Sequence, residues 1–360
     1  MKTYRLLLAL FLLATPLIPA FPAHPLKAYN MNCHGIATAN YSGITRISGN
    51  HYAIVSDTEI PDGFYDFYIL LDPQTGRVIK VERGAFHANP NPVKNSNGSL
   101  FRRDTEGVAY CPKRNTVFIS GEADQRIIEY DTLGVPTGHE LAIPEWCSSE
   151  SIVYNRGFEA LAYSPEKAWF YTMTESPLKA DGPIVCSATP HAPQLLRLLA
   201  FSDSLTLCSQ KVYAMDPATT TRFKHYYTYG VSAMTALPDG RLLVLEREIN
   251  IPRRAWSGSV RHRIYIADPT TGSELPSNAP TSALQPKEYV SKRLLTEFTT
   301  RLNLLHTKLG NYEGLCLGPR LSDGSYTILL INDSQAGAGN SLYRLKDFLK
   351  VFVFSDNELQ

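Results

Sequence analysis

The sequence predicts an all-β protein, a β-propeller with five visible blade repeats, and three observations lead to this fold class. One hairpin plan recurs five times along the chain. The segments between the copies are mostly short apolar stretches joined by turns. The 20 tyrosines, 15 phenylalanines and 24 prolines suit many short strands and the turns between them. Repeats of this period indicate that each copy is one supersecondary unit.

Each copy begins with a small or acidic residue, runs through two short apolar segments separated by a turn, and ends on a carboxylate. The clearest copy is EGVAYCPKRNTVFISGE, residues 106–122, and EALAYSPEKAWFYTMTE, residues 159–175, has the same length. The remaining copies span residues 42–57, 232–246 and 313–333. Five copies predict five blades, and a sixth, degenerate blade remains open.

The segments between the hairpins complete the blades in chain order. Residues 24–40 carry little periodicity and are expected to lead into the ring or to close it. The second unit, for example, continues from its hairpin into RIIEYD and HELAIPEW, which gives four β-like segments in about 40 residues, the format of a propeller blade. The fifth unit ends in FLKVFVF near the C-terminus. Among these segments, LLTEFTTRLNLLHTKL, residues 294–309, is an example that we expect to form a short helix.

Composition and the N-terminal segment bound the class of protein. The net charge of +1 argues against a nucleic-acid binder, which usually carries a basic face. Residues 1–23 resemble a signal peptide, with Lys2 and Arg5 before an apolar run that is too short to span a bilayer. We therefore expect residues 24–360 to form a single exported domain, periplasmic or extracellular and monomeric, with no transmembrane segment in the mature chain.

Six cysteines allow fifteen full pairings, and export permits disulfides. Cys111 and Cys316 fall in repeated inner segments, where a buried thiol is expected. Cys147, Cys186 and Cys208 fall in loops or outer segments and are the better candidates for bridges. No cysteine or histidine spacing suggests zinc.

Hairpin geometry gives the repeat a functional meaning. In an antiparallel pair the start of the first strand lies beside the end of the second, so each copy places its opening and closing residues at one end. Around a ring, ten such positions meet at one face. Two are Ser42 and Ser232, and the other eight are acidic: Asp57, Glu106, Glu122, Glu159, Glu175, Glu246, Glu313 and Asp333. So many carboxylates together need cations, protons or basic partners.

The same residues carry a resemblance to a known family. RRDTEGVAY, GFEALAYSPEKAWFYTMTES, MTALPDGRLLVLERE and NYEGLCLGP, in this order, resemble the "esterase-like activity of phytase" family of secreted bacterial proteins. The resemblance covers most of the chain after the leader, from about residue 40 to residue 345. It implies a propeller-like β protein with phosphoester or ester hydrolase activity.

From the residues we expect a hydrolytic site assisted by Ca²⁺, because carboxylates are ligands that hard cations prefer. Glu106, Glu159 and Glu313 open inner strands and are the expected catalytic residues. The expected metal ligands close the neighbouring strands: Asp57, Glu122, Glu175, Glu246 and Asp333. Basic residues beside them are the expected contacts for an anionic phosphate substrate: Arg103, Arg247 and Lys179. Lys179 belongs to an insertion, residues 176–193, that follows Glu175 and is expected to cover the acidic face.

Other readings of these residues stay open. A single strand-end glutamate can simply accept backbone hydrogen bonds or pair with an arginine. Gly107 and Gly314 indicate close backbone approach near a narrow axis. There is no Gly-x-Ser-x-Gly nucleophile elbow, so a serine esterase lacks support. The alternative function is a non-catalytic propeller that binds a ligand, a glycan or an envelope protein.

Overall fold

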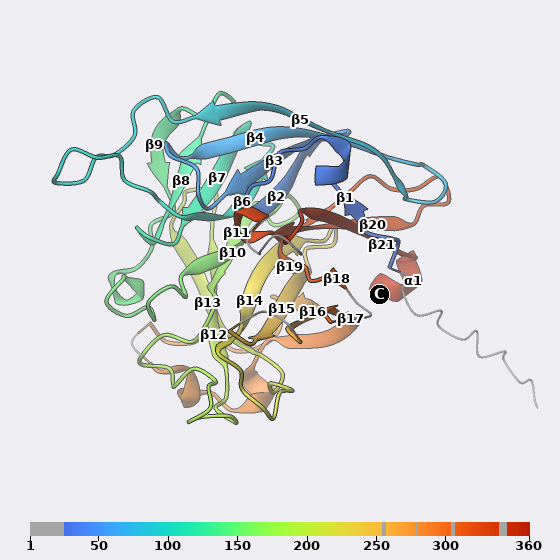
Figure 1. The fold of residues 1–360 in the computed structure, drawn as a ribbon. Helices are drawn as coiled ribbons and strands as arrows, with labels where there is room; N and C mark the ends of the chain where they lie inside the picture. The colour runs from blue at the N-terminus through green and yellow to red at the C-terminus, as the bar shows by residue number, and fades with distance from the viewer. Residues whose placement is uncertain (1–24, 254–256, 278, 304–306, 338–343) are drawn as a thin grey trace, which may run out of the picture.

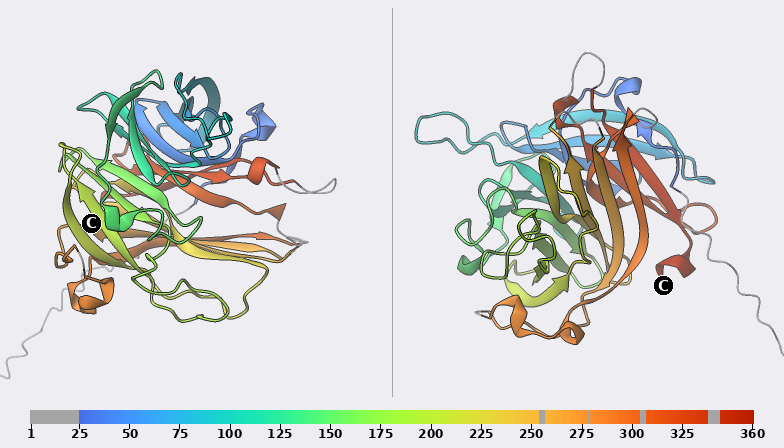
Figure 2. Two further views of the ribbon diagram at one scale, coloured as in Figure 1. Left: turned by 90° about the vertical axis from the view of Figure 1, so that its left-hand side faces the viewer. Right: turned by 60° about the horizontal axis from the view of Figure 1, so that its bottom comes forward.

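Five antiparallel sheets follow one another around a common axis in the computed structural model (Figures 1 and 2). The structure describes residues 25–253, 257–277, 279–303, 307–337 and 344–360. The expected signal peptide, residues 1–23, lies outside the described residues. The predicted five-bladed propeller is confirmed. No helix among the described residues is long and apolar enough to cross a membrane.

Blade 1 contains β2 (Tyr41–Ser48), β3 (His51–Ser56), β4 (Gly63–Leu71) and β5 (Val78–Ala88). Blade 2 contains β6 (Thr105–Cys111), β7 (Thr116–Gly121), β8 (Arg126–Tyr130) and β9 (Pro136–Glu140). Blade 3 contains β10 (Phe158–Ser164), β11 (Trp169–Thr174), β12 (Leu195–Phe201) and β13 (Leu207–Ala214). Blade 4 contains β14 (Tyr226–Ala236), β15 (Leu242–Ile251), β16 (Ser259–Asp268), β17 (Ser291–Leu302) and β18 (Thr307–Lys308).

Blade 5 closes the ring with both ends of the chain. It contains β19 (Asn311–Leu317), β20 (Tyr326–Asp333), β21 (Phe348–Phe354) and, from the N-terminal side, β1 (Tyr29–Asn30). Tyr29 pairs with Leu349, so the segment before the first hairpin completes the last blade, as expected (Figure 1). The first strands of the five blades, β2, β6, β10, β14 and β19, contact one another in that order around the axis.

Helical structure is confined to short connections. The 3₁₀ turns are η1 (Asn32–His34), η2 (Glu145–Cys147), η3 (Thr281–Ala283), η4 (Pro286–Glu288) and η5 (Gln335–Gly337), and the one α-helical turn described is α1 (Asp356–Leu359). The expected helix over residues 294–309 is wrong, because most of its described residues lie in β17 and β18. β17 pairs along β16, and sheet pairing outweighs the local helix propensity of this segment.

Five of the six hydrophobic clusters among the described residues lie between two neighbouring blades, and a small sixth cluster lies at the outer part of blade 4. Strand β20 shows the reason. Leu329 and Ile331 pack toward blade 1, whereas Ile328 and Leu330 pack toward blade 4. Since successive side chains of a strand point to opposite faces, a strand between two blades is apolar on both faces. The continuous apolar run ILLI, residues 328–331, is therefore what this position requires.

All six cysteines lie in the described part of the chain and are free thiols. The bridges expected from Cys147, Cys186 and Cys208 are therefore not formed. Cys111 and Cys316 are buried, as expected, and Cys147 is buried as well. Neighbouring blades are held by the apolar clusters and by hydrogen bonds between blades.

Candidate functional site

The opening residue of every hairpin lies at a β-bulge in an inner strand. Strand pairing shifts register across each of them, for example between Phe158 and Ala160 opposite Thr174 and Met173. The same shift occurs in the other four inner strands. A bulge leaves its extra residue without a partner in the ladder and re-aims the side chain. The bulged residues are Ser42, Glu106, Glu159, Ser232 and Glu313.

The same register identifies the closing positions without reference to residue type. In each blade the inner-strand residue before the bulge pairs with a residue of the second strand. The residue that follows this partner in the second strand is the closing position. The paired residues are Ser56, Gly121, Thr174, Glu246 and Asn332. The closing residues are therefore Asp57, Glu122, Glu175, Arg247 and Asp333. Four of the five expected acids occupy these positions, and in blade 4 the position belongs to an arginine.

Glu246 is thus one residue out of register with the acids that it was expected to join. It is 1% exposed and lies inside the interface between blades 3 and 4, where it accepts hydrogen bonds from Tyr213 (3.0 Å), Tyr229 (2.9 Å) and Lys292 (2.5 Å). A shift of one residue moves a strand side chain to the opposite face. Glu246 therefore belongs to a buried polar cluster and does not face the axis.

Arg247 holds carboxylates from two other blades together at the axis. Its Nη2 donates to Glu159 (3.3 Å) and Glu175 (2.7 Å), and its Nη1 donates to Glu313 and to Asn311 Oδ1 (3.2 Å). Only 3% of Arg247 is exposed. The guanidinium offers several donors in a rigid fork, which allows one cation to fix several carboxylates. Its hydrogen bonds to these carboxylates leave it little capacity for the substrate phosphate that it was expected to bind.

A glycine or alanine follows each bulged residue and brings the blades close together. A Cβ atom on Gly107 would lie 2.6 Å from the carbonyl oxygen of Glu159 in the next blade, and one on Gly43 would lie 2.3 Å from that of Glu106. Gly314 is similarly confined, with Ile331 Cγ2 at 2.5 Å. The Glu-Gly pairs thus have the structural role expected for them. They keep the axial cavity narrow and its carboxylates close.

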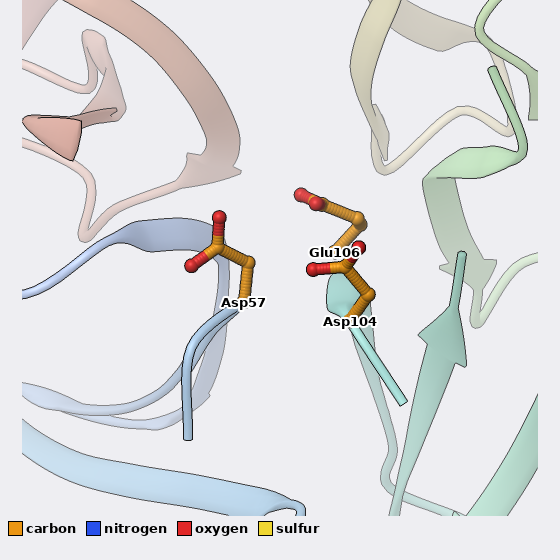
Figure 3. A group of neighbouring side chains, drawn as sticks. All are labelled: Asp57, Asp104 and Glu106. Atoms are coloured by element: carbon orange, nitrogen blue, oxygen red, sulfur yellow. The ribbon is translucent and has the colours of Figure 1, made fainter. Parts of the chain in front are cut away.

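A second group of acids forms at the boundary of blades 1 and 2. Asp57, Asp104 and Glu106 each offer a carboxylate oxygen within 4.8 Å of the others, and Figure 3 shows the carboxylates of Asp104 and Glu106 directed toward the side of Asp57. Asn40 Nδ2 donates to Asp57 Oδ2 (3.2 Å), whereas the buried Asp57 Oδ1 has no hydrogen-bond partner among the described residues. Arg102 is 3.6 Å from Asp104. This acidic triad, Asp57, Asp104 and Glu106, could hold a metal ion.

The bulged residues and the closing residues surround one end of the axis, which we call the acidic mouth. Burial and mutual repulsion raise the pKa values of its acids. Burial is the main cause for Glu106, whose pKa is raised further by Glu313, Glu159, Asp57 and Glu122. It also raises the pKa of Asp57 to about 7 and that of Glu313 to about 8, in spite of Arg247. The pKa of Glu122 and that of Asp333 are each raised to about 7, again mainly by burial. Several carboxyl groups of this mouth therefore exchange protons near neutral pH.

Two of the expected phosphate contacts lie away from this mouth. Arg103 is 2% exposed and binds Asp124 (2.6 Å), Tyr130 (2.9 Å) and the carbonyl of Arg126 (2.8 Å) within blade 2. Lys179 is exposed, and its Nζ donates to the carbonyl of Glu150 (2.7 Å). Neither side chain has a described contact with the carboxylates of the mouth.

The insertion at residues 176–193 connects the end of β11 to the start of β12, so it leaves blade 3 on the mouth side, as expected. Its described contacts lie farther from the axis than the mouth, because Asp181 binds Arg197 of the third strand (2.6 Å) and the backbone N–H of Thr281 (2.9 Å).

Blade 4 extends farther than the other blades on the mouth side. β14 begins six residues before Ser232, and its pairing with β15 continues to Tyr226 and Ile251. These longer strands form a wall beside the mouth.

Sequence reasoning missed two charged residues of the site. Asp104 comes two residues before Glu106 and has φ 58°, a left-handed conformation that aspartate tolerates better than most residues. Arg156 precedes β10 and contacts Glu175 (2.9 Å) with a side chain that is 22% exposed. Both lie just before an inner strand in RRDTEG and NRGFEA, and this shared position was the available signal.

The comparisons with known proteins can now be set beside this geometry. Residues 36–335 match the phytase-like family model described as "Esterase-like activity of phytase". A search of curated proteins finds no match. Similar solved structures include a structural genomics protein of unknown function from Bacteroides thetaiotaomicron (9% identity, 91% of this chain and 72% of that chain, TM-score 0.36). Another is Kuenenia stuttgartiensis hydrazine synthase (11% identity, 84% of this chain and 96% of that chain, TM-score 0.31).

Both TM-scores are below 0.5, so these likenesses carry no argument about function. The family match is of a different kind, since it extends over most of the chain and includes every bulged acid and every closing residue of the mouth. This chain therefore belongs to the phytase-like family described by the esterase-like activity of phytase.

Proposed function

We propose that the protein is an exported hydrolase of phosphate esters whose acidic mouth works with a bound divalent cation, Ca²⁺ being the first candidate. The observation that carries the proposal is the acidic triad, Asp57, Asp104 and Glu106, beside the axial carboxylates. The family description, which names phytase and an esterase-like activity, supports the reaction class. Fold by itself does not, because propellers serve many functions.

The residues of the acidic triad fit a hard cation. Calcium–oxygen distances are about 2.3–2.6 Å, so ligands on opposite sides of the ion are about 5 Å apart. The three carboxylate oxygens lie within 4.8 Å of one another, and the buried Asp57 Oδ1 lacks a partner among the described residues. A bound cation would supply a positive charge that attracts the phosphate and polarises its phosphorus–oxygen bonds.

The chain's own side chains would hold the phosphate group and exchange protons. The pKa of Glu122 is raised to about 7, so its carboxyl group can hold or release a proton near neutral pH, as a general acid or base requires. Arg247 keeps Glu159 and Glu313 in fixed positions at the axis. The exposed Arg102 and the half-buried Arg156 have guanidinium groups near the mouth, and in this proposal they replace Arg103 and Lys179 as the phosphate contacts.

Calcium binding and phosphatase activity test the proposal together. Titration calorimetry should detect Ca²⁺ binding to wild type after treatment with EDTA, and hydrolysis of p-nitrophenyl phosphate should need added Ca²⁺. Asp57→Asn should weaken Ca²⁺ binding by at least about tenfold, since it removes one charged ligand. Asp323→Asn, in an exposed turn outside the mouth, is the control and should change neither property.

The outcomes separate the remaining readings. Calcium binding without hydrolysis of any phosphate or carboxyl ester would favour the alternative, a non-catalytic propeller that binds a ligand, a glycan or an envelope protein. No calcium binding by folded wild type would contradict the metal site. The acids would then be structural groups that protons and Arg247 keep together.

A further inference from the structure

The axis has a second mouth at the opposite end of the inner strands, and this mouth opens into a cavity of about 350 Å³. All five inner strands line it with residues four positions after the bulges: Arg46, Tyr110, Tyr163, Ala236 and Leu317. A volume of this size lies within the range of small-molecule sites. No expected site residue lies here, and the proposed hydrolase does not use this end.

The charge of this cavity comes from Arg46. Its Nε donates to the carbonyl of Gly49 (2.7 Å), and its Nη1 donates to the carbonyl of Gly318 in blade 5 (3.2 Å). These bonds fix the half-buried guanidinium, and no carboxylate among the described residues forms an ion pair with it. An arginine has five N–H donors, so at least two remain for a ligand.

The other groups that line the cavity leave this charge uncompensated. Burial raises the pKa of Tyr163 and that of Cys316, so both side chains remain neutral at physiological pH. The Tyr110 hydroxyl donates to Asn115 (2.8 Å), and the Tyr163 ring packs on Phe170 with 4.8 Å between ring centroids. Both rings are therefore held in place as flat walls. Pro112, Pro165 and Leu317 add apolar surface beside the two rings.

We propose that this second mouth binds a small anionic molecule with a planar ring, whose carboxylate or phosphate group pairs with Arg46 while its ring packs between Tyr110 and Tyr163. A guanidinium matches the two oxygens of such an anion. Aromatic walls favour a planar apolar body through offset or edge-to-face packing. The two ends of the axis then have opposite preferences, since the acidic mouth repels anions when no cation is bound.

The test uses 2-naphthoate and its neutral counterpart 2-naphthamide, with ligand fluorescence anisotropy as the measurement. EDTA is present throughout, so that a cation at the acidic mouth cannot recruit the anion. Wild type should bind 2-naphthoate saturably. Arg46→Gln should weaken this binding roughly 10- to 100-fold, the value of a charge-assisted hydrogen-bonded pair. Affinity for 2-naphthamide should be nearly the same in both proteins.

Two further variants keep the test decisive if Arg46→Gln folds poorly. Ala236→Phe places a large ring in the cavity and leaves Arg46 in the chain, and it should abolish binding of both compounds. Arg126→Gln removes an exposed arginine of blade 2 that pairs with Glu140, and it should bind like wild type. The proposal is overturned if wild type shows no saturable binding, if Ala236→Phe binds normally, or if Asp57→Asn changes the affinity for 2-naphthoate, which would place the ligand at the acidic mouth.

Discussion

At the scale of single residues, the site depends on one guanidinium placed among carboxylates. Arg247 contacts Glu159, Glu175 and Glu313, which come from blades 3 and 5. A buried ion pair contributes little net stability when compared with an apolar replacement, but removing one partner leaves buried charges without compensation. Arg247 is therefore better described as the residue that makes this arrangement of carboxylates possible than as a source of stability.

Arg247→Met should lower the free energy of unfolding by about 3–5 kcal/mol near pH 8, because it leaves buried carboxylates without their cation. The measurement is urea unfolding in EDTA, followed by circular dichroism. The loss should be smaller near pH 5, because protonation relieves the repulsion. Arg126→Met, which breaks an exposed pair, should cost about 0–1 kcal/mol and serves as the control. A loss for Arg247→Met no larger than the control would show that the cluster does not need this cation.

At the scale of elements, the bulged inner strand is the unit that builds the site. The bulge aims one side chain at the mouth, and the next residue must be small because the neighbouring blade lies against it. The carbonyl oxygen of Glu159, for example, would lie 2.6 Å from a Cβ atom on Gly107. The position of one blade's bulge therefore depends on the glycine of the blade before it. This coupling fixes the spacing of the carboxylates around the axis.

Gly107→Ala should destabilise the protein by about 1–3 kcal/mol, the usual cost of overpacking, because its new methyl group meets backbone that cannot move alone. Calcium affinity at the mouth should fall as well, since Glu106 adjoins this residue. Gly84→Ala is the matched control. It lies exposed on the outer strand β5, where the nearest atom is a side-chain atom, Asp66 Cβ at 3.0 Å, and its effect should be smaller. Equal effects of the two substitutions in urea unfolding would contradict a special role for the axial glycine.

At the scale of the whole molecule, the ring brings together more buried carboxyl groups than its arginine side chains neutralise. The folded-state pKa values of Asp57, Glu122 and Asp333 are raised to about 7, and that of Glu313 to about 8. These groups bind protons more tightly in the folded than in the unfolded protein. Stability must then fall as pH rises from their unfolded values, about 4, through the folded values.

The melting temperature in EDTA should therefore decrease from about pH 6.5 to about pH 8.5, and added Ca²⁺ should stabilise the protein more at the upper end of this range. His262 acts in the opposite direction, since its pKa is lowered by burial, but only below about pH 6.5, the unfolded value for histidine. Differential scanning calorimetry measures the trend. A melting temperature that rises with pH across this window in EDTA would show that repulsion between the carboxylates of the mouth does not destabilise the folded protein.

The sequence by itself identified the five blade repeats, their order and the hairpins that meet at one mouth, and it left a sixth blade open. This was possible because each blade repeats a local pattern of apolar segments and turns. It also identified seven of the eight expected acids of the mouth correctly by position. These features depend on residues close together in the chain, which a pattern of spacing can reveal.

Only the tertiary structure decided which side chains face the axis and which partners they meet. A bulge adds one residue to a strand and turns the next side chain to the other face, so Glu246 could not be distinguished from Arg247 by spacing. Arg103 was expected at the mouth and is paired within its blade, while Asp104 was overlooked and joins Asp57. These contacts connect residues of different strands and blades. Their geometry is set by how strands and blades pack, and a single sequence does not record it.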